Sequence, residues 1–327
     1  MHETKENNFL DVILFVFLAI SISFIMNWAG NVKGIASAIL LAPFAVGVLA
    51  FAFQVLIIKS PLIALYTKSY PYRRLKPYGV VTTFLLFEFL LAWGLHTKQI
   101  NLNNGDILLI TITFIGVIVY YHLFVRMKIS LRFFFLAILI PFLALAAAVG
   151  LSSRLNLIQF ISPTKSIYKT VILNTFYWII SGVFFQLVCE ELAFRGYLMQ
   201  RLVKKNEFFA VLVSSLVYAI WRLPFSLFIG AGLREIIIAF SGSFITGIIF
   251  ALLFIKGRNL LVPVLCHSII SGLQISLFTN TANPGISSYI HFIMPVSRIG
   301  LMSFWIGFLA IGLILLTLIP RKNLRVI

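Results

Sequence analysis

Residues 168–195 read YKTVILNTFYWIISGVFFQLVCEELAFR, an apolar run that ends on three charged side chains. A membrane-spanning helix needs roughly 20 apolar residues, and this run reaches that length. Glu190 and Glu191 are adjacent carboxylates, and Arg195 follows one helical turn later. Charged side chains in hydrocarbon are costly unless they are paired or hydrated, and they mark functional sites by default. The stretch therefore predicts a membrane helix that carries a site, and residues 196–199 contain no strong stop signal to end that helix.

The rest of the chain is similarly apolar. Of its 327 residues, 61% are hydrophobic and 11% are charged, and the mean hydropathy is +1.05. Soluble domains hold about 25% charged residues, so the soluble and disordered classes are excluded. The apolar runs predict an all-α polytopic membrane protein with about ten transmembrane helices. These runs cover about 9–29, 34–58, 78–97, 106–125, 131–152, 168–190, 207–223, 235–255, 259–278 and 299–319.

Lysine and arginine gather in alternate loops between the predicted helices, for example in 68–76, 126–132, 201–205 and 321–325. Because cytoplasmic loops carry an excess of these residues, we expect both termini in the cytoplasm. The net charge of +17 then reflects topology and attraction to anionic lipid. The basic residues flank spans and form no patterned patch, which argues against nucleic-acid binding. A composition rich in Lys, Ile, Phe and Asn, with short loops, favours a bacterial plasma membrane.

The chain divides into three predicted regions. Residues 1–77 form an N-terminal transmembrane hairpin and a basic cytoplasmic loop, and its first helix is expected to be retained because no small-residue cleavage site follows it. Residues 78–160 are accessory transmembrane helices, and residues 161–327 hold the core and a C-terminal helix. The run at 207–223 is short, which indicates a partly interfacial helix. The two cysteines, Cys189 and Cys266, are interpreted as small apolar packing residues.

Three predicted helices each carry two polar residues four positions apart, a spacing that places both on one face of a helix. The pairs are Glu191 and Arg195, Tyr218 and Arg222, and His267 and Ser271. A hairpin turn near 205–206 would leave Glu190 and Arg222 each about 24 Å from the turn at 1.5 Å per residue. His267 would lie somewhat closer to its own turn at 257–258. The three sets are therefore predicted to line one cavity.

These motifs resemble those of the CPBP superfamily, which includes the type II CAAX prenyl endopeptidases and bacteriocin-processing enzymes and is also called the Abi family. Its marks are Glu-Glu-x-x-x-Arg on one helix, an aromatic residue followed by x-x-x-His on the next, and His-x-x-x-Asn or Asp on a later one. The resemblance covers roughly 168–278 and includes Glu190, Glu191 and Arg195 in full. It implies peptide hydrolysis inside the membrane, with Glu190 as general base on a water molecule and Glu191 and Arg195 setting the local electrostatics.

The chain departs from the family pattern at three positions. Tyr218 replaces the usual phenylalanine, Ser271 replaces asparagine or aspartate, and Arg222 stands where the first histidine belongs. A guanidinium cannot ligate a metal ion, so a two-histidine metal site is excluded and no cofactor is expected. His267, Ser271 and Arg222 remain candidates for binding the water or the oxyanion, and Arg222 is either a fixed oxyanion donor or a lock on Glu190.

Two functions stay open on the sequence alone. The first is an intramembrane endopeptidase that cleaves a membrane-proximal peptide or protein. The second is a catalytically inactive scaffold of the same architecture that binds and regulates a membrane partner, as an immunity or cell-envelope factor. Two carboxylates and two arginines at similar depth form a neutral cluster that an inactive enzyme would keep as structure. A transporter is a distant third, because paired repeats and broken helices are not visible.

Overall fold

The computed structural model describes residues 10–31, 36–53, 131–154, 158–160, 186–203, 206–257, 259–277, 290–292, 307, 310–314 and 317. These residues are almost entirely helical. The predicted spans at 78–97 and 106–125 lie outside them, as do most of the predicted spans at 168–190 and 299–319. Three described helices, with spans at Leu10–Gly30, Glu207–Phe228 and Leu233–Gly257, are long and apolar enough to cross a membrane, and Leu131–Ala147 and Leu261–Leu273 are shorter apolar helices. The membrane class predicted from composition is confirmed, whereas the number of about ten helices stays a prediction.

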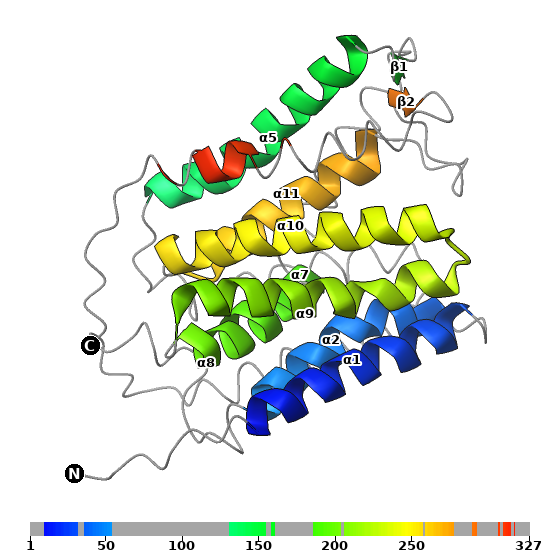
Figure 1. Cartoon of the computed structure of the whole chain (residues 1–327), viewed down its shortest axis with the longest axis vertical. Helices are drawn as coiled ribbons and strands as arrows, with labels where there is room; N and C mark the ends of the chain where they lie inside the picture. The colour runs from blue at the N-terminus through cyan, green and yellow to red at the C-terminus, as the bar shows by residue number, and fades with distance from the viewer. Residues whose placement is uncertain are drawn as a thin grey trace, which may run out of the picture.

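The long helices run roughly alongside one another (Figure 1). An N-terminal hairpin of α1 (Leu10–Asn31) and α2 (Ala36–Ala52) packs against the middle of the molecule. The middle consists of α7 (Gln186–Glu191), α9 (Glu207–Phe228) and α10 (Leu233–Gly257), and α7 lies behind α9 in the view of Figure 1. On the far side of α10 lie α11 (Leu261–Leu277) and α5 (Leu131–Arg154). The hairpin and α5 thus enclose the helices that carry the predicted site residues.

The predicted sixth span does continue past Arg195, and it changes its helical type there. After α7 the chain forms a π-helix, η3 (Leu192–Met199), and then a last α-helical turn, α8 (Gln200–Val203). All eight residues of η3 are buried. π-helical segments inside α-helices are rare and occur frequently at functional sites. The carboxylates of the sequence motif lie directly before this segment.

The turn between α8 and α9 lies where the sequence predicted it. The side chain of Asn206 accepts a hydrogen bond from the backbone N–H of Phe209, 3.1 Å away, and so caps the start of α9. The predicted end of this helix at residue 223 was wrong, because α9 continues through Pro224 to Phe228. With 22 residues it is long enough to span the membrane, so the expectation of a partly interfacial helix is corrected.

The prediction of an all-α fold omitted one small element. Strands β1 (Ile158–Phe160) and β2 (Ile290–Phe292) pair antiparallel, with Gln159 opposite His291. They lie beyond one end of α5 and join two connecting segments that the sequence indicated only as loops (Figure 1). Three-residue strands leave almost no periodic signal, which explains why the sequence did not predict them.

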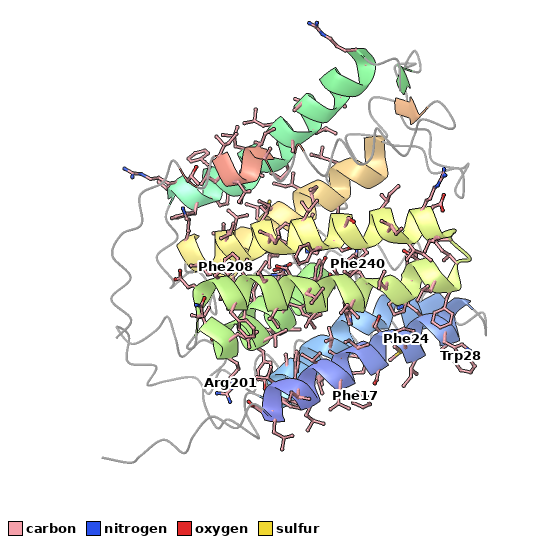
Figure 2. The ribbon with its side chains drawn as sticks, viewed as in Figure 1. Phe17, Phe24, Trp28, Arg201, Phe208 and Phe240 are labelled. Atoms are coloured by element: carbon pink, nitrogen blue, oxygen red, sulfur yellow. The ribbon has the colours of Figure 1, made fainter. Side chains whose placement is uncertain are left out.

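Aromatic packing fixes the hairpin onto the π-helical segment. The ring of Phe15 in α1 lies 4.5 Å from that of Tyr197 in η3, centroid to centroid, and Phe53 lies 5.8 Å from the same tyrosine ring. At the same end, the Arg201 guanidinium pairs with Asp11 at 2.6 Å. Figure 2 shows Arg201 beside the start of α1, whereas Phe17 lies on the outer side of that helix. The inner aromatic side chains of the hairpin hold η3 in place, whereas outer apolar side chains such as Phe17 are exposed.

Candidate functional site

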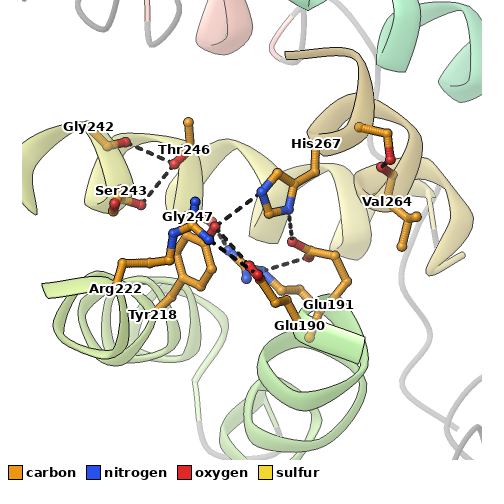
Figure 3. A network of polar contacts seen from close by, with 12 residues as sticks. Glu190, Glu191, Tyr218, Arg222, Gly242, Ser243, Thr246, Gly247, Val264 and His267 are labelled. Atoms are coloured by element: carbon orange, nitrogen blue, oxygen red, sulfur yellow. Dashed lines mark hydrogen bonds and ion pairs between the residues drawn. The ribbon is translucent and has the colours of Figure 1, made fainter. Parts of the chain in front are cut away.

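The candidate site lies where α7, α9 and α11 approach one another beside α10. Figure 3 shows Glu190 and Glu191 rising from α7, Tyr218 and Arg222 from α9, and His267 from α11. Both glutamates are fully buried, and His267 is 3% exposed. Buried charges are stable only when they are paired and hydrogen-bonded, so the partners of each carboxylate decide what the site can do.

Glu190 contacts α9 through both carboxylate oxygens. Its Oε1 lies 3.3 Å from Nη1 of Arg222, and its Oε2 accepts a hydrogen bond of 3.4 Å from the hydroxyl of Tyr218. Both distances are at the long end of the hydrogen-bond range. The carboxylate is therefore held in position by contacts that a shift of a few tenths of an ångström would break.

His267 connects Tyr218 to the second glutamate. Its Nε2 lies 3.3 Å from the Tyr218 hydroxyl, and its Nδ1 lies 3.0 Å from Oε1 of Glu191. A carboxylate accepts and does not donate, so the Nδ1 that faces Glu191 carries a proton. This contact fixes the orientation of the ring, and Nε2 is left facing Tyr218.

Glu191 and Arg195 form the most buried ion pair of the cluster. Nε of Arg195 lies 3.3 Å from Oε2 of Glu191, and neither side chain is exposed. Nη2 of the same arginine donates to the backbone carbonyl of Gly247 in α10, 3.0 Å away. Its guanidinium carbon also lies 4.7 Å from the ring centroid of Tyr218, which is a cation–π contact. Arg195 therefore ties the π-helix to both α9 and α10.

The ring of Phe250 supports the histidine from α10. It stacks on His267 with the centroids 4.6 Å apart and an interplanar angle of 29°. Phe250 itself is fully buried. With Glu191 on one edge and Phe250 on one face, the imidazole has little freedom to rotate, which preorganises its Nε2 toward the tyrosine.

Together these contacts form one continuous chain, in the order Arg222, Glu190, Tyr218, His267, Glu191, Arg195 and Gly247. Two carboxylates and two guanidiniums balance in charge within it. Arg222 differs from the other members because its side chain is 40% exposed. It is therefore the member of the chain that a molecule arriving from outside the helix bundle reaches first.

The structure brings together Glu190, Glu191, Arg195, Arg222 and His267, five of the six residues that the sequence singled out. The sixth, Ser271, lies one turn beyond His267 on α11 and makes no hydrogen bond within the described part of the chain. Their catalytic roles stay predictions. Sequence reasoning treated Tyr218 only as a mild replacement and missed that its hydroxyl bridges two helices. The carbonyl of Gly247 left no sequence signal at all.

The donor set does not suit a metal ion. Among the residues that the structure describes, no three His, Cys, Asp or Glu side chains come together as a metal site requires. The guanidinium of Arg222, a fixed cation, lies against Glu190 where a second histidine ligand would be needed. A divalent cation bound to Glu190 would be repelled at that distance. We therefore derive no chemical step through a metal.

The two cysteines adjoin the site in the sequence. Cys189 precedes Glu190 and Cys266 precedes His267, and both are fully buried. No disulfide is present in the described segments of the molecule. Cys189 faces α2, where the position of Gly47 leaves room for its side chain. This placement agrees with the interpretation of cysteine as a small packing residue.

Comparison with known proteins agrees with the geometry over one segment. Neither a curated protein nor a solved structure matches the chain. One family model matches, and its bounds include η3, α9 and α10 entirely and part of α11. All the residues that form the continuous series of contacts from Arg222 to Gly247 fall within these bounds. Residues 172–273 match the family described as type II CAAX prenyl endopeptidase Rce1-like, which is consistent with the CPBP superfamily to which the sequence motifs pointed.

Proposed function

We propose that this protein is an intramembrane endopeptidase that cleaves a membrane-proximal peptide or protein with water activated by Glu190. The observation that carries the proposal is that the two carboxylates differ in how they are held by neighbouring side chains. Glu191 is held by an ion pair of 3.3 Å in which both side chains are fully buried, and by a contact of 3.0 Å to His267. Glu190 pairs at the same 3.3 Å with Arg222, whose side chain is 40% exposed, and its second contact, to Tyr218, is 3.4 Å long. Glu190 is thus the carboxylate that is positioned to exchange a contact for a water molecule.

In the proposed reaction Glu190 takes a proton from water as the water oxygen adds to the carbonyl carbon of the scissile peptide bond. The carbonyl oxygen becomes an oxyanion in a tetrahedral intermediate. The carbon–nitrogen bond then breaks, and Glu190 returns the proton to the departing amine nitrogen. A positioned carboxylate outside bulk water is a competent base for this transfer. The products are one carboxylic acid, whose hydroxyl comes from the water, and one amine, and no other reactant is needed.

Donors for the oxyanion come from the groups around Glu190. Arg222 and the hydroxyl of Tyr218 both point at this carboxylate, and His267 lies directly behind the hydroxyl. Fixed donors in a site that excludes water stabilise a developing negative charge far better than they would in water. Glu191 and Arg195 touch His267 and Tyr218 and act by holding them in place.

A second function has its own supporting observation. Each carboxylate of the cluster lies 3.3 Å from an arginine, so the cluster is neutral as it stands. Such a closed set of ion pairs is also what a non-catalytic scaffold needs to fix the packing of α7, α9 and α11. In that case the protein binds and regulates a membrane partner. Arg222 then holds Glu190 fixed and does not act on a substrate.

The experiment that separates the two functions compares peptide termini in membranes and medium of cells that express the native chain or Glu190→Gln at equal abundance. New termini that vanish with Glu190→Gln establish the protease and identify its substrate. Glu207→Gln is a matched control, because Glu207 lies in the first turn of α9 outside the cluster. Identical termini in all three cell lines, with a cellular phenotype that survives Glu190→Gln, favour the scaffold.

We also infer the topology from the distribution of lysine and arginine. With both termini in the cytoplasm, the turn that holds 204–206 lies on the cytoplasmic side and the turn at 229–232 lies on the opposite side. The expected compartment is a bacterial plasma membrane. Tagging each terminus with a reporter that is active only in the cytoplasm tests the orientation, and an inactive reporter at either end contradicts it.

A further inference from the structure

The N-terminal hairpin, which lies outside the matched segment at 172–273, contacts the backbone next to the site at two places. In the first, the hydroxyl of Ser23 in α1 donates a hydrogen bond of 2.6 Å to the backbone carbonyl of Trp221. Asn27, one turn further along α1, donates in turn to the Ser23 carbonyl at 2.8 Å. Both side chains are buried. Trp221 immediately precedes Arg222.

Pro224 lies in the same turn of α9, three residues after Trp221. A proline inside a helix has no N–H for the carbonyl four residues earlier, and its ring crowds that turn. Transmembrane helices tolerate such a proline where serine or threonine side chains of neighbouring helices satisfy the loosened backbone. In α9 the carbonyl four residues before Pro224 is that of Ile220, and Ser23 binds the neighbouring carbonyl of Trp221, in the loosened turn that carries Arg222. The direction in which this turn presents Arg222 therefore depends on α1.

The second contact is between α2 and α7. A Cβ atom added to Gly47 would lie 2.9 Å from the Cβ of Cys189 and 3.3 Å from its Cα. Such a distance is shorter than real Cβ atoms show, so only glycine permits the two helices to approach this closely. Cys189 immediately precedes Glu190. The backbone position of Glu190 therefore depends on α2.

We propose that the α1–α2 hairpin is a clamp that sets the spacing of the Glu190–Arg222 ion pair, with Ser23 and Gly47 as positioning residues. The hairpin packs as one unit, and it touches the chain one residue before each partner of the pair. The pair itself is held by a single contact of 3.3 Å. A shift of either attachment by about an ångström takes the pair beyond hydrogen-bonding distance.

A double-mutant cycle on the full-length protein in detergent tests the Ser23 half of the clamp without any assay of activity. The melting temperature is measured for the native chain, Ser23→Ala, Arg222→Gln and the double variant. Ser23→Ala lowers the melting temperature in the native background and in the Arg222→Gln background. If Ser23 acts through Arg222, the decrease is smaller in the Arg222→Gln background, by at least about 2 °C. Equal shifts in both backgrounds overturn the role of Ser23.

Ser214→Ala is the matched control for this cycle. Ser214 is fully buried on α9, and within the described part of the chain its hydroxyl bonds to the Val211 carbonyl of its own helix, at 3.4 Å. Its effect on the melting temperature should therefore be the same with and without Arg222→Gln. A control that couples to Arg222 as strongly as Ser23 does would show that any lost hydroxyl disturbs α9, and it would overturn the assignment.

The Gly47 half is tested by moving the Cβ atom from one helix to the other. The coupling between Glu190→Gln and Arg222→Gln is measured in the native chain, in Gly47→Ala and in Gly47→Ala with Cys189→Gly. The clamp predicts that the coupling falls to near zero in Gly47→Ala and returns when Cys189→Gly removes the opposing Cβ. Coupling that persists in Gly47→Ala, or that fails to return in the double variant, contradicts the proposal.

The effect of the clamp on cleavage rests on the proposed function, whereas its effect on the ion pair does not. If the native chain produces termini that depend on Glu190, Ser23→Ala and Gly47→Ala should each reduce them at equal abundance, by up to about 100-fold for a displacement near 1 Å. Unchanged cleavage in both variants overturns the positioning role. If the native chain produces no such termini, the protease proposal fails, and the two cycles still decide whether the clamp exists.

Discussion

The hydroxyl of Tyr218 lies 3.3 Å from Nε2 of His267, and the same hydroxyl donates to Glu190 at 3.4 Å. One side chain thus links the carboxylate proposed as base to the histidine that Glu191 orients. The family pattern has phenylalanine at this position, where no such link is possible. The chain departs from the pattern both here and at Arg222, one turn later on α9. We interpret the two departures as a pair that works together.

Tyr218→Phe is expected to reduce Glu190-dependent cleavage about 100-fold, the loss typical for one donor to an oxyanion. The ring and its packing on Phe194 remain, so abundance should change little. The number of Glu190-dependent termini formed per unit time measures the effect. Tyr197→Phe is the control, because it removes a buried hydroxyl that bonds to Asp11 outside the site. Equal losses in both variants would assign the effect to folding.

Arg222→His restores the family residue at one position only. In a working site that relies on the guanidinium, this change is expected to reduce cleavage about tenfold or more, since histidine cannot replace the fixed charge beside Glu190. The double variant Tyr218→Phe with Arg222→His matches the family pattern at both positions and should recover part of the activity. Cleavage that appears only after Arg222→His would instead identify the native chain as an inactive scaffold.

Arg195→Gln is expected to destabilise the fold itself. Its guanidinium is fully buried between Glu191 and the Gly247 carbonyl, and its removal leaves a buried carboxylate without its cation. Breaking a buried pair from one side costs about 3–5 kcal/mol. Reversible unfolding in mixed micelles measures the loss. Arg234→Gln, an exposed arginine in the first turn of α10, should change the free energy of unfolding by less than about 0.5 kcal/mol.

The sequence predicted the membrane class, the span at residues 9–29 and the hairpin turn near Asn206, because each rests on a strong local signal. Placing Glu190 and Arg222 at one level also followed from helical rise alone, and the ion pair between them agrees with that estimate. The predicted end of α9 at residue 223 was wrong, because the helix continues through Pro224. The bridging role of Tyr218 and the Gly247 acceptor depend on side-chain direction and on packing between helices, which residue spacing does not encode.

Gly247→Ala tests whether the packing of α10 positions Arg195. An added Cβ would lie 2.9 Å from the Cβ of Ser215 and 3.0 Å from its Cα, so α10 must move away from α9. That movement carries the Gly247 carbonyl away from Arg195. We expect a loss of about 1–3 kcal/mol in the free energy of unfolding, the usual cost of overpacking, together with reduced cleavage.

Two further variants decide how that loss arises. Gly150→Ala is the matched control, because Gly150 lies in helix α5 with open space around it, and alanine there should be neutral or stabilising. Ser215→Gly, added to Gly247→Ala, removes the opposing Cβ and should recover both stability and cleavage. Recovery of stability without cleavage would show that the contact between Arg195 and the Gly247 carbonyl requires glycine at 247 itself. Full tolerance of Gly247→Ala would contradict the role assigned to α10 in holding Arg195.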